Sequence, residues 1–298
     1  MYDRILIPVD GSEEATRAAR EGLAFATEFD AAVDVIHVVE RKALRLTRSS
    51  DQETRLRERG TEILADVEAI AAEHGRSIAT EMLEGDPADR ISDYARERDA
   101  GLIVIGRQGL TNLGRHLLGG VTEAVLHRSE VPVLVVTDDS GTTGRTGDCS
   151  RVLLPTDGSD NAATATEHGI AIARQYGSTL HVLNVVDLQE AGGVFDAGGL
   201  EEEFVERLEA TGAAAVEAAV DEISETAPDI DVESAVVRTS SFDGAAAGIR
   251  KYVREHDVDL VVMGSHGRSN LERQLLGSVA STLLRTLDVP VLIVRREG

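Results

Sequence analysis

The chain has 298 residues, which is enough for two ordinary domains, and 42% of the residues are hydrophobic. Its formal net charge of −23 argues against nucleic acid and anionic membranes as partners. The single cysteine, Cys149, excludes an internal disulfide framework. No apolar run reaches the roughly 18 residues that a membrane span requires.

The composition also predicts a cellular setting. The opening "MYDRILIPVD" lacks a basic region followed by an apolar stretch and a cleavage site, so we expect no signal peptide and a cytoplasmic location. Asp and Glu total 53, whereas lysine occurs only at Lys42 and Lys251. This pattern favours a halophilic protein, because molar salt screens self-repulsion. An ordinary acidic protein from a GC-rich genome is the alternative.

Strand and helix patterns alternate along the first half of the chain. We expect strands at 4–9, 33–39, 77–84, 102–106 and 132–136, and helices near 13–29, 53–74, 87–98 and 120–129. The strands are continuous apolar runs such as "LIVIG", as expected when both faces of a sheet are covered. The alternation predicts an α/β fold with a parallel, doubly wound sheet.

The second half repeats the first. "RILIPVDGS" at 4–12 matches "RVLLPTDGS" at 151–159, and "VPVLVV" at 131–136 matches "VPVLIV" at 289–294. We therefore predict two tandem domains, 1–137 and 151–298, joined by a linker at 138–150. The offset grows from 147 to 158 residues, and we assign the extra residues to the glycine-rich stretch 188–199.

One loop carries the strongest functional signal. "GSHGRSNLERQLLGS" at 264–278 joins an expected buried strand to an expected helix. In an open α/β sheet, ligands bind outside the carboxyl ends of the strands, where the winding reverses. Glycines let the backbone approach a ligand, the helix start offers N–H groups to an anion, and Arg268 and Arg273 add positive charge. Neither the P-loop nor the dinucleotide pattern matches, so an ordinary surface loop remains an alternative.

The loop resembles the nucleotide signature of the ATP-binding branch of the universal stress protein family. That signature is G-x-x-G, nine residues, then G-[ST], and Gly264, Gly267, Gly277 and Ser278 reproduce it. The opening and closing motifs also resemble the family in both copies, so the resemblance covers nearly the whole chain. It implies that each copy is a five-stranded parallel sheet of order 3-2-1-4-5 with helices on both faces.

The resemblance also implies a nucleotide site in each copy. In the second copy the implied residues, with Arg268 added for its charge, are Pro155, Asp157, Val185, Met263, Gly264, Gly267, Arg268, Gly277, Ser278 and Val279. In the first copy they are Pro8, Asp10, Val38, Ile105, Gly106, Gly109, Gly119, Gly120 and Val121. Gly120 departs from the pattern, because it stands where the family has Ser or Thr. Losing a hydrogen bond to a charged group costs about 1.5–3 kcal/mol, so we expect weaker binding or another nucleotide there.

The implied function is a nucleotide-binding protein of stress response or signalling. The implied cofactor is ATP, or ADP or AMP, with Mg²⁺ as an optional companion. We expect at most slow hydrolysis and no dedicated enzyme, because no set of acidic metal ligands and no nucleophile elbow is present. Ser12 and Ser159 are expected helix caps, and the scattered histidines predict no zinc site. A nucleotide-free interaction scaffold of the same fold is the alternative function.

The last strand of each copy carries a prediction about assembly. Residues 131–136 and 289–294 are hydrophobic, and exposed sheet edges are usually paired or covered. In the family this strand mediates dimerisation, which implies that the two copies pair within one chain. The resemblance also allows two chains to form a homodimer.

Overall fold

The computed structural model describes residues 1–40, 50–110, 117–137, 149–188, 202–267 and 276–295. The chain divides into two compact units, Met1–Gly147 and Asp148–Gly298. Three sequence predictions lie mainly outside the described residues: most of the 138–150 linker, the stretch 189–199, and the loop arginines Arg268 and Arg273.

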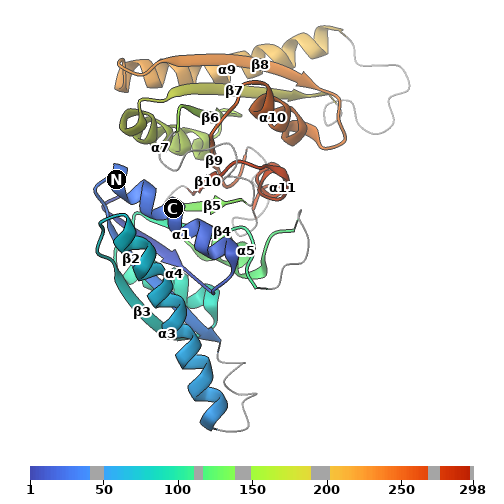
Figure 1. Cartoon of the computed structure of the whole chain (residues 1–298). Helices are drawn as coiled ribbons and strands as arrows, with labels where there is room; N and C mark the ends of the chain where they lie inside the picture. Colours follow the sequence, from blue (N-terminus) through green and yellow to red (C-terminus); the bar gives the residue numbers. More distant parts are fainter. Residues whose placement is uncertain (41–49, 111–116, 138–148, 189–201, 268–275, 296–298) are drawn as a thin grey trace. The chain divides into compact units, whose positions relative to one another are not determined.

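The first unit is a five-stranded parallel sheet with helices on both faces (Figure 1). Its strands are β1 (Arg4–Pro8), β2 (Ala32–Glu40), β3 (Ala79–Gly85), β4 (Leu102–Gly106) and β5 (Val133–Val136). Its helices are α1 (Glu13–Glu28), α3 (Ser50–Glu73), α4 (Pro87–Glu97) and α5 (Gly120–Arg128). The strand order β3-β2-β1-β4-β5 confirms the predicted 3-2-1-4-5 sheet. Contacts place α1 and α3 on one face, and α4 and α5 on the other.

The second unit repeats this arrangement. Its strands are β6 (Arg151–Pro155), β7 (Thr179–Asp187), β8 (Val232–Thr239), β9 (Leu260–Gly264) and β10 (Val291–Val294). Its helices are α7 (Asp160–Tyr176), α9 (Glu202–Thr226), α10 (Gly244–Glu255) and α11 (Ser278–Thr286). The order β8-β7-β6-β9-β10 is the same doubly wound order, and all its strand pairs are parallel.

The small-residue face predicted for the first helix of each copy packs on the sheet. A Cβ added to Gly22 in α1 would lie 2.6 Å from Cδ1 of Ile7 on β1. In α7, a Cβ on Gly169 would lie 2.6 Å from Cδ2 of Leu154 on β6. A side chain at either position would force Ile7 or Leu154 to move, so these glycines let the helix approach the strand closely.

The predicted position of the extra residues is only partly correct. Register pairs join Asp34 to Ala79 in the first unit and His181 to Glu233 in the second, so the offset has risen from 147 to 154 by the third strand. It reaches 158 at the fourth strand. Seven residues therefore enter before β8 and four after it. Most of these four lie at 240–243, between β8 and α10, where the first unit has only Asp86.

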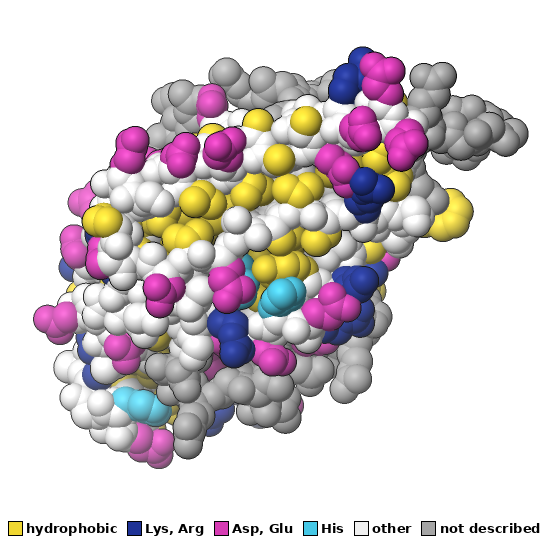
Figure 2. Space-filling view, turned by 90° about the horizontal axis from the view of Figure 1, so that it is seen from above, with side chains coloured by type: hydrophobic (Ala, Val, Ile, Leu, Met, Phe, Trp, Pro, Cys, Tyr) yellow, Lys and Arg dark blue, Asp and Glu magenta, His cyan; other side chains and the backbone are white. Residues whose placement is uncertain are grey.

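The surface carries the charge that the composition predicts. Figure 2 shows acidic side chains spread over the displayed face, with Lys and Arg side chains between them and apolar side chains alongside. In the described part of the chain, no helix has the length and apolar character needed to cross a membrane.

Candidate functional site

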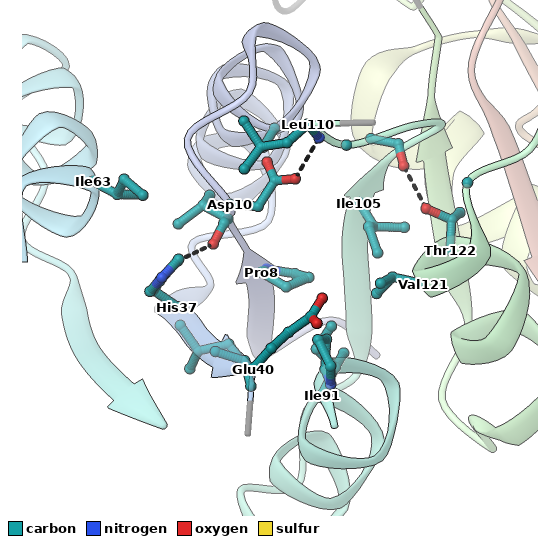
Figure 3. Close-up of a pocket in the computed structure, with 18 of the residues that line it drawn as sticks. Pro8, Asp10, His37, Glu40, Ile63, Ile91, Ile105, Leu110, Val121 and Thr122 are labelled. Carbon is teal, nitrogen blue, oxygen red and sulfur yellow. Dashed lines mark hydrogen bonds between the residues drawn. The ribbon is translucent and has the colours of Figure 1, made fainter. Parts of the chain in front are cut away.

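A cavity of about 460 Å³ opens in the first unit at the carboxyl ends of β1, β2 and β4 (Figure 3). The sheet order reverses between β1 and β4, so this is the switch point where an open α/β sheet binds ligands. All nine residues predicted for the first copy line this cavity: Pro8, Asp10, Val38, Ile105, Gly106, Gly109, Gly119, Gly120 and Val121. The fold thus collects residues from four separate segments of the sequence.

Sequence reasoning missed the wall that faces this loop. The additional lining side chains come mainly from α3, α4 and the end of β2, and they include His37, Glu40, Leu56, Arg59, Ile63, Pro87 and Ile91. Most of this wall is apolar, which suits a flat nucleobase better than a phosphate. No local motif marks these residues, because only the crossing of α3 and α4 over the sheet brings them to the cavity.

Asp10 organises the glycine loop. Its Oδ1 accepts a hydrogen bond from the N–H of Ser12 at 2.9 Å. Its Oδ2 accepts one from the N–H of Leu110 at 2.9 Å (Figure 3). A Cβ on Gly109 would lie only 2.3 Å from that Oδ2. Gly109 is therefore glycine because the loop backbone comes up against this carboxylate, and Asp10 ties β1 to the loop across 100 residues of sequence.

The far end of the loop is tied to β4. The N–H of Gly119 donates to the carbonyl of Arg107 at 2.9 Å, and Oγ1 of Thr122 donates to the carbonyl of Gly106 at 2.8 Å. A Cβ on Gly119 would lie 3.2 Å from the Arg107 oxygen, closer than most side chains tolerate. These bonds fix the place where α5 begins relative to the cavity.

The start of α5 lines the cavity. Gly119 is the N-cap and Gly120 the first helical residue, and both line the cavity with Val121. The first N–H groups of a helix have no partner within it, and the helix dipole places positive charge at the same end. Among the lining residues that the structure describes, Arg59 is the only arginine or lysine.

His37 anchors the adjoining strand end. Its Nδ1 lies 2.8 Å from the carbonyl oxygen of Val9 (Figure 3). A carbonyl oxygen only accepts hydrogen bonds, so Nδ1 carries the proton and Nε2 is the acceptor in the neutral ring. In the second unit Asn184 takes this place, and its Nδ2 donates to the carbonyl of Thr156 at 2.7 Å.

The second unit repeats the same skeleton with its own residues. Oδ1 of Asp157 accepts from the N–H of Ser159 at 3.0 Å, and a Cβ on Gly267 would lie 2.4 Å from Oδ2 of Asp157. The N–H of Gly277 donates to the carbonyl of Ser265 at 2.8 Å. The predicted residues lie at the ends of β6, β7 and β9 and at the start of α11, as follows: Pro155, Asp157, Val185, Met263, Gly264, Gly267, Gly277, Ser278 and Val279.

Comparison with known proteins identifies the architecture. The universal stress protein family matches residues 1–137 and 149–295, which is nearly the whole chain. The chain belongs to the universal stress protein family. A universal stress protein of Mycolicibacterium smegmatis is 31% identical over 98% of this chain and 96% of its own length. Universal stress protein MJ0531 of Methanocaldococcus jannaschii is 43% identical over 46% of this chain and 82% of its own length.

The fold comparison agrees with this assignment. The crystal structure of a universal stress protein from Archaeoglobus fulgidus covers 100% of both chains with a TM-score of 0.73 at 23% identity. At this level of identity the likeness shows the fold alone.

Within this universal stress protein, the first residue of the helix that follows the loop differs between the two units. Ser278 begins α11, and its side chain is exposed. A Cβ added to its counterpart Gly120 would meet no atom within 4 Å, so the first unit has room for the missing hydroxyl. His266 has a bond inside its own loop, because its Nδ1 lies 2.9 Å from Oγ of Ser265.

Proposed function

We propose that this universal stress protein binds an adenine nucleotide, ATP or its ADP or AMP forms, at the carboxyl end of the sheet in each unit. The observation that carries the proposal is the convergence of all nine predicted residues of the first unit on one cavity of about 460 Å³. That volume is in the range of small-molecule sites, which run from about 300 to 1,000 Å³. The apolar wall formed by Leu56, Ile63 and Ile91 receives the base, and the start of α5 receives phosphate.

The second unit is the stronger site in this proposal. It keeps Ser278 at the start of α11, whereas the first unit has Gly120. Phosphate contacts in the first unit rest on backbone N–H groups alone at that position. Mg²⁺ is an optional companion of the phosphates. We also propose that the chain belongs to the ATP-binding branch of the family and comes from a halophile.

The proposed role is signalling by occupancy, without dedicated catalysis. Both Asp10 oxygens already accept backbone N–H groups, so their first task is to hold the loop. Nucleotide binding would order the loop and the helix that follows, and a partner would respond to that state. A steady ATP turnover that disappears in Asp157→Ala would overturn the non-catalytic part of this proposal.

The test begins with protein purified in high salt without added nucleotide. The protein is denatured, and any released small molecule is identified and quantified by mass spectrometry. A molar ratio near two adenine nucleotides per chain means that both loops bind a nucleotide. A ratio near one means that the two units differ. No released nucleotide, followed by no heat signal on titration with Mg-ATP, would overturn the proposal in favour of a nucleotide-free scaffold.

A matched pair of substitutions tests the geometry. Gly109→Ala places a methyl group 2.3 Å from the Asp10 carboxylate, whereas Gly120→Ala places one in open space. We expect Gly109→Ala to weaken nucleotide binding in the first unit and Gly120→Ala to leave it nearly unchanged. Equal affinities for the two variants would contradict the proposed site.

We also propose that the two units of one chain pair through residues 131–136 and 289–294. The argument is the hydrophobic character of both segments and the tendency of sheet edges to be covered. Leu292→Asp should separate the units, which small-angle scattering would report as a larger radius of gyration. Concentration-dependent scattering of the unchanged protein separately tests whether two chains form a homodimer.

A further inference from the structure

We propose that the second unit holds a zinc-class divalent metal ion between His181, Glu233 and His256. Nothing in the proposed nucleotide function uses these residues. His181 is near the start of β7 and Glu233 near the start of β8, whereas the nucleotide site lies at the opposite, carboxyl ends of the strands. His256 is the C-cap of α10. Three elements thus meet at one point.

The ligand atoms are already close together. One ligand atom from each of the three residues lies within 4.8 Å of the others, and Nδ1 of His181 is 3.6 Å from Oε2 of Glu233. Tetrahedral zinc bound at about 2.0–2.2 Å brings its ligands to about 3.4 Å from one another. Closing the set shortens the longest distance between ligand atoms by at most about 1.4 Å. Glu233 and His256 can make this change, because both side chains are accessible to solvent.

The ligand types favour zinc or a similar transition metal. Two imidazoles and one carboxylate leave a fourth position for water, a known tetrahedral zinc arrangement, whereas Ca²⁺ and Mg²⁺ prefer oxygen ligands only. His181 is 3% exposed, and burial lowers the pKa of its ring, while nearby Glu233 raises it and His256 and Arg151 lower it further. Metal ions bind the neutral form of an imidazole ring.

The Tyr252 side chain contacts both imidazoles. Its ring stacks on His256 with centroids 3.9 Å apart and planes 17° apart, and its hydroxyl oxygen lies 3.1 Å from Nδ1 of His181. Because Nδ1 is also the His181 atom that lies 3.6 Å from Oε2 of Glu233, a metal ion bound at Nδ1 would replace this contact with Tyr252. Arg151 is the opposing positive charge in this neighbourhood, and it is exposed.

The first unit shows what this position looks like without a metal site. The counterparts of the three proposed ligands are Asp34, Ala79 and Arg98, as the strand register and the C-cap of α4 show. Nε of Arg98 donates to Asp34 at 3.3 Å, and Arg4 also donates to Asp34 at 3.0 Å. The first unit fills the position with ion pairs. The second has replaced both the arginine and the aspartate with histidine and added Glu233.

The test titrates the full chain, treated with chelator and free of nucleotide, with Zn²⁺ by calorimetry. We expect one Zn²⁺ per chain, and affinity at least tenfold weaker in His256→Ala and in Glu233→Gln. Both substitutions are at solvent-accessible positions, so folding should survive. His74→Ala is the matched control: His74 is an exposed histidine at the end of α3 whose Nδ1 lies 2.8 Å from the carbonyl oxygen of Ile70. It should leave the affinity unchanged.

Cobalt supplies a second readout. Co²⁺ in a tetrahedral site absorbs visible light strongly, so the chain should become coloured at one equivalent and His256→Ala should not. A chain that binds no Zn²⁺ overturns the proposal. The same conclusion follows if His256→Ala and Glu233→Gln bind Zn²⁺ as tightly as the unchanged chain does.

Discussion

Gly120→Ser should tighten nucleotide binding in the first unit. The substitution restores the hydroxyl that Ser278 offers in the second unit, and a Cβ at Gly120 meets no atom within 4 Å. Gly120 has no positive φ, so serine needs no strained backbone there. One hydrogen bond to a charged phosphate is worth about 1.5–3 kcal/mol. The affinity should therefore rise by about 10- to 150-fold, since 1.4 kcal/mol corresponds to a factor of ten.

The assay must isolate the first unit within the full chain. Gly277→Val silences the second unit, because a Cβ on Gly277 already lies 3.2 Å from the Ser265 carbonyl oxygen and valine adds two methyl groups. In that background, Gly120→Ser is compared with Gly120→Ala by calorimetric titration with Mg-ATP. Alanine controls for the loss of glycine flexibility without adding a hydroxyl. Equal affinities for the serine and alanine variants would refute the reasoning that the hydroxyl binds phosphate.

Three further predictions concern stability. The melting temperature should be lower in dilute buffer than in molar KCl, because salt screens the repulsion of a chain with net charge −23; an unchanged value would contradict this. Gly22→Ala should cost about 1–3 kcal/mol of unfolding free energy in denaturant titrations, since its methyl group would overlap Ile7; a neutral effect would show that α1 can shift. Ser12→Ala should cost about 1 kcal/mol, because Oγ of Ser12 accepts the N–H of Ala15 at 3.1 Å; a circular dichroism melt that matches the unchanged chain would refute it.

Much of the fold could be predicted from local patterns. Continuous apolar runs and the alternation of strand and helix predict the order of elements in the first unit. The sequence repeat predicts the same order in the second unit. The predicted strand at 77–84 is β3 at Ala79–Gly85, and the predicted helix at 53–74 is α3 at Ser50–Glu73. The ends of the elements differ from the predicted ones by a few residues. Capping and strand pairing determine these ends, and hydrophobic periodicity contains no information about capping or pairing. Ser12 and Ser159 are the exceptions, since both are N-caps as predicted.

The site could be predicted only where the chain itself carries a motif. The loop glycines and Asp10 belong to short sequence signatures, so the sequence predicts that they are site residues. Leu56 and Ile91 carry no signature, because apolar residues on a helix look the same whether they face a cavity or a core. The cluster of His181 with His256 was missed for a related reason. These histidines are 75 residues apart, and only the register of β7 with β8 and the end of α10 bring them together.

The two proposed sites of the second unit should act independently unless β7 couples them. His181 and Val185 lie on this one strand four residues apart, which corresponds to about 13 Å at 3.3 Å per residue. This separation exceeds the Debye length of about 8 Å at physiological ionic strength, so the direct attraction between the metal ion and the phosphate is weak. If metal binding changes the nucleotide affinity, the change must therefore arise from altered packing of β7 against β8 and α10. The first unit has ion pairs instead of these histidines. Its nucleotide affinity therefore serves as an internal control, because the added metal ion should not change it.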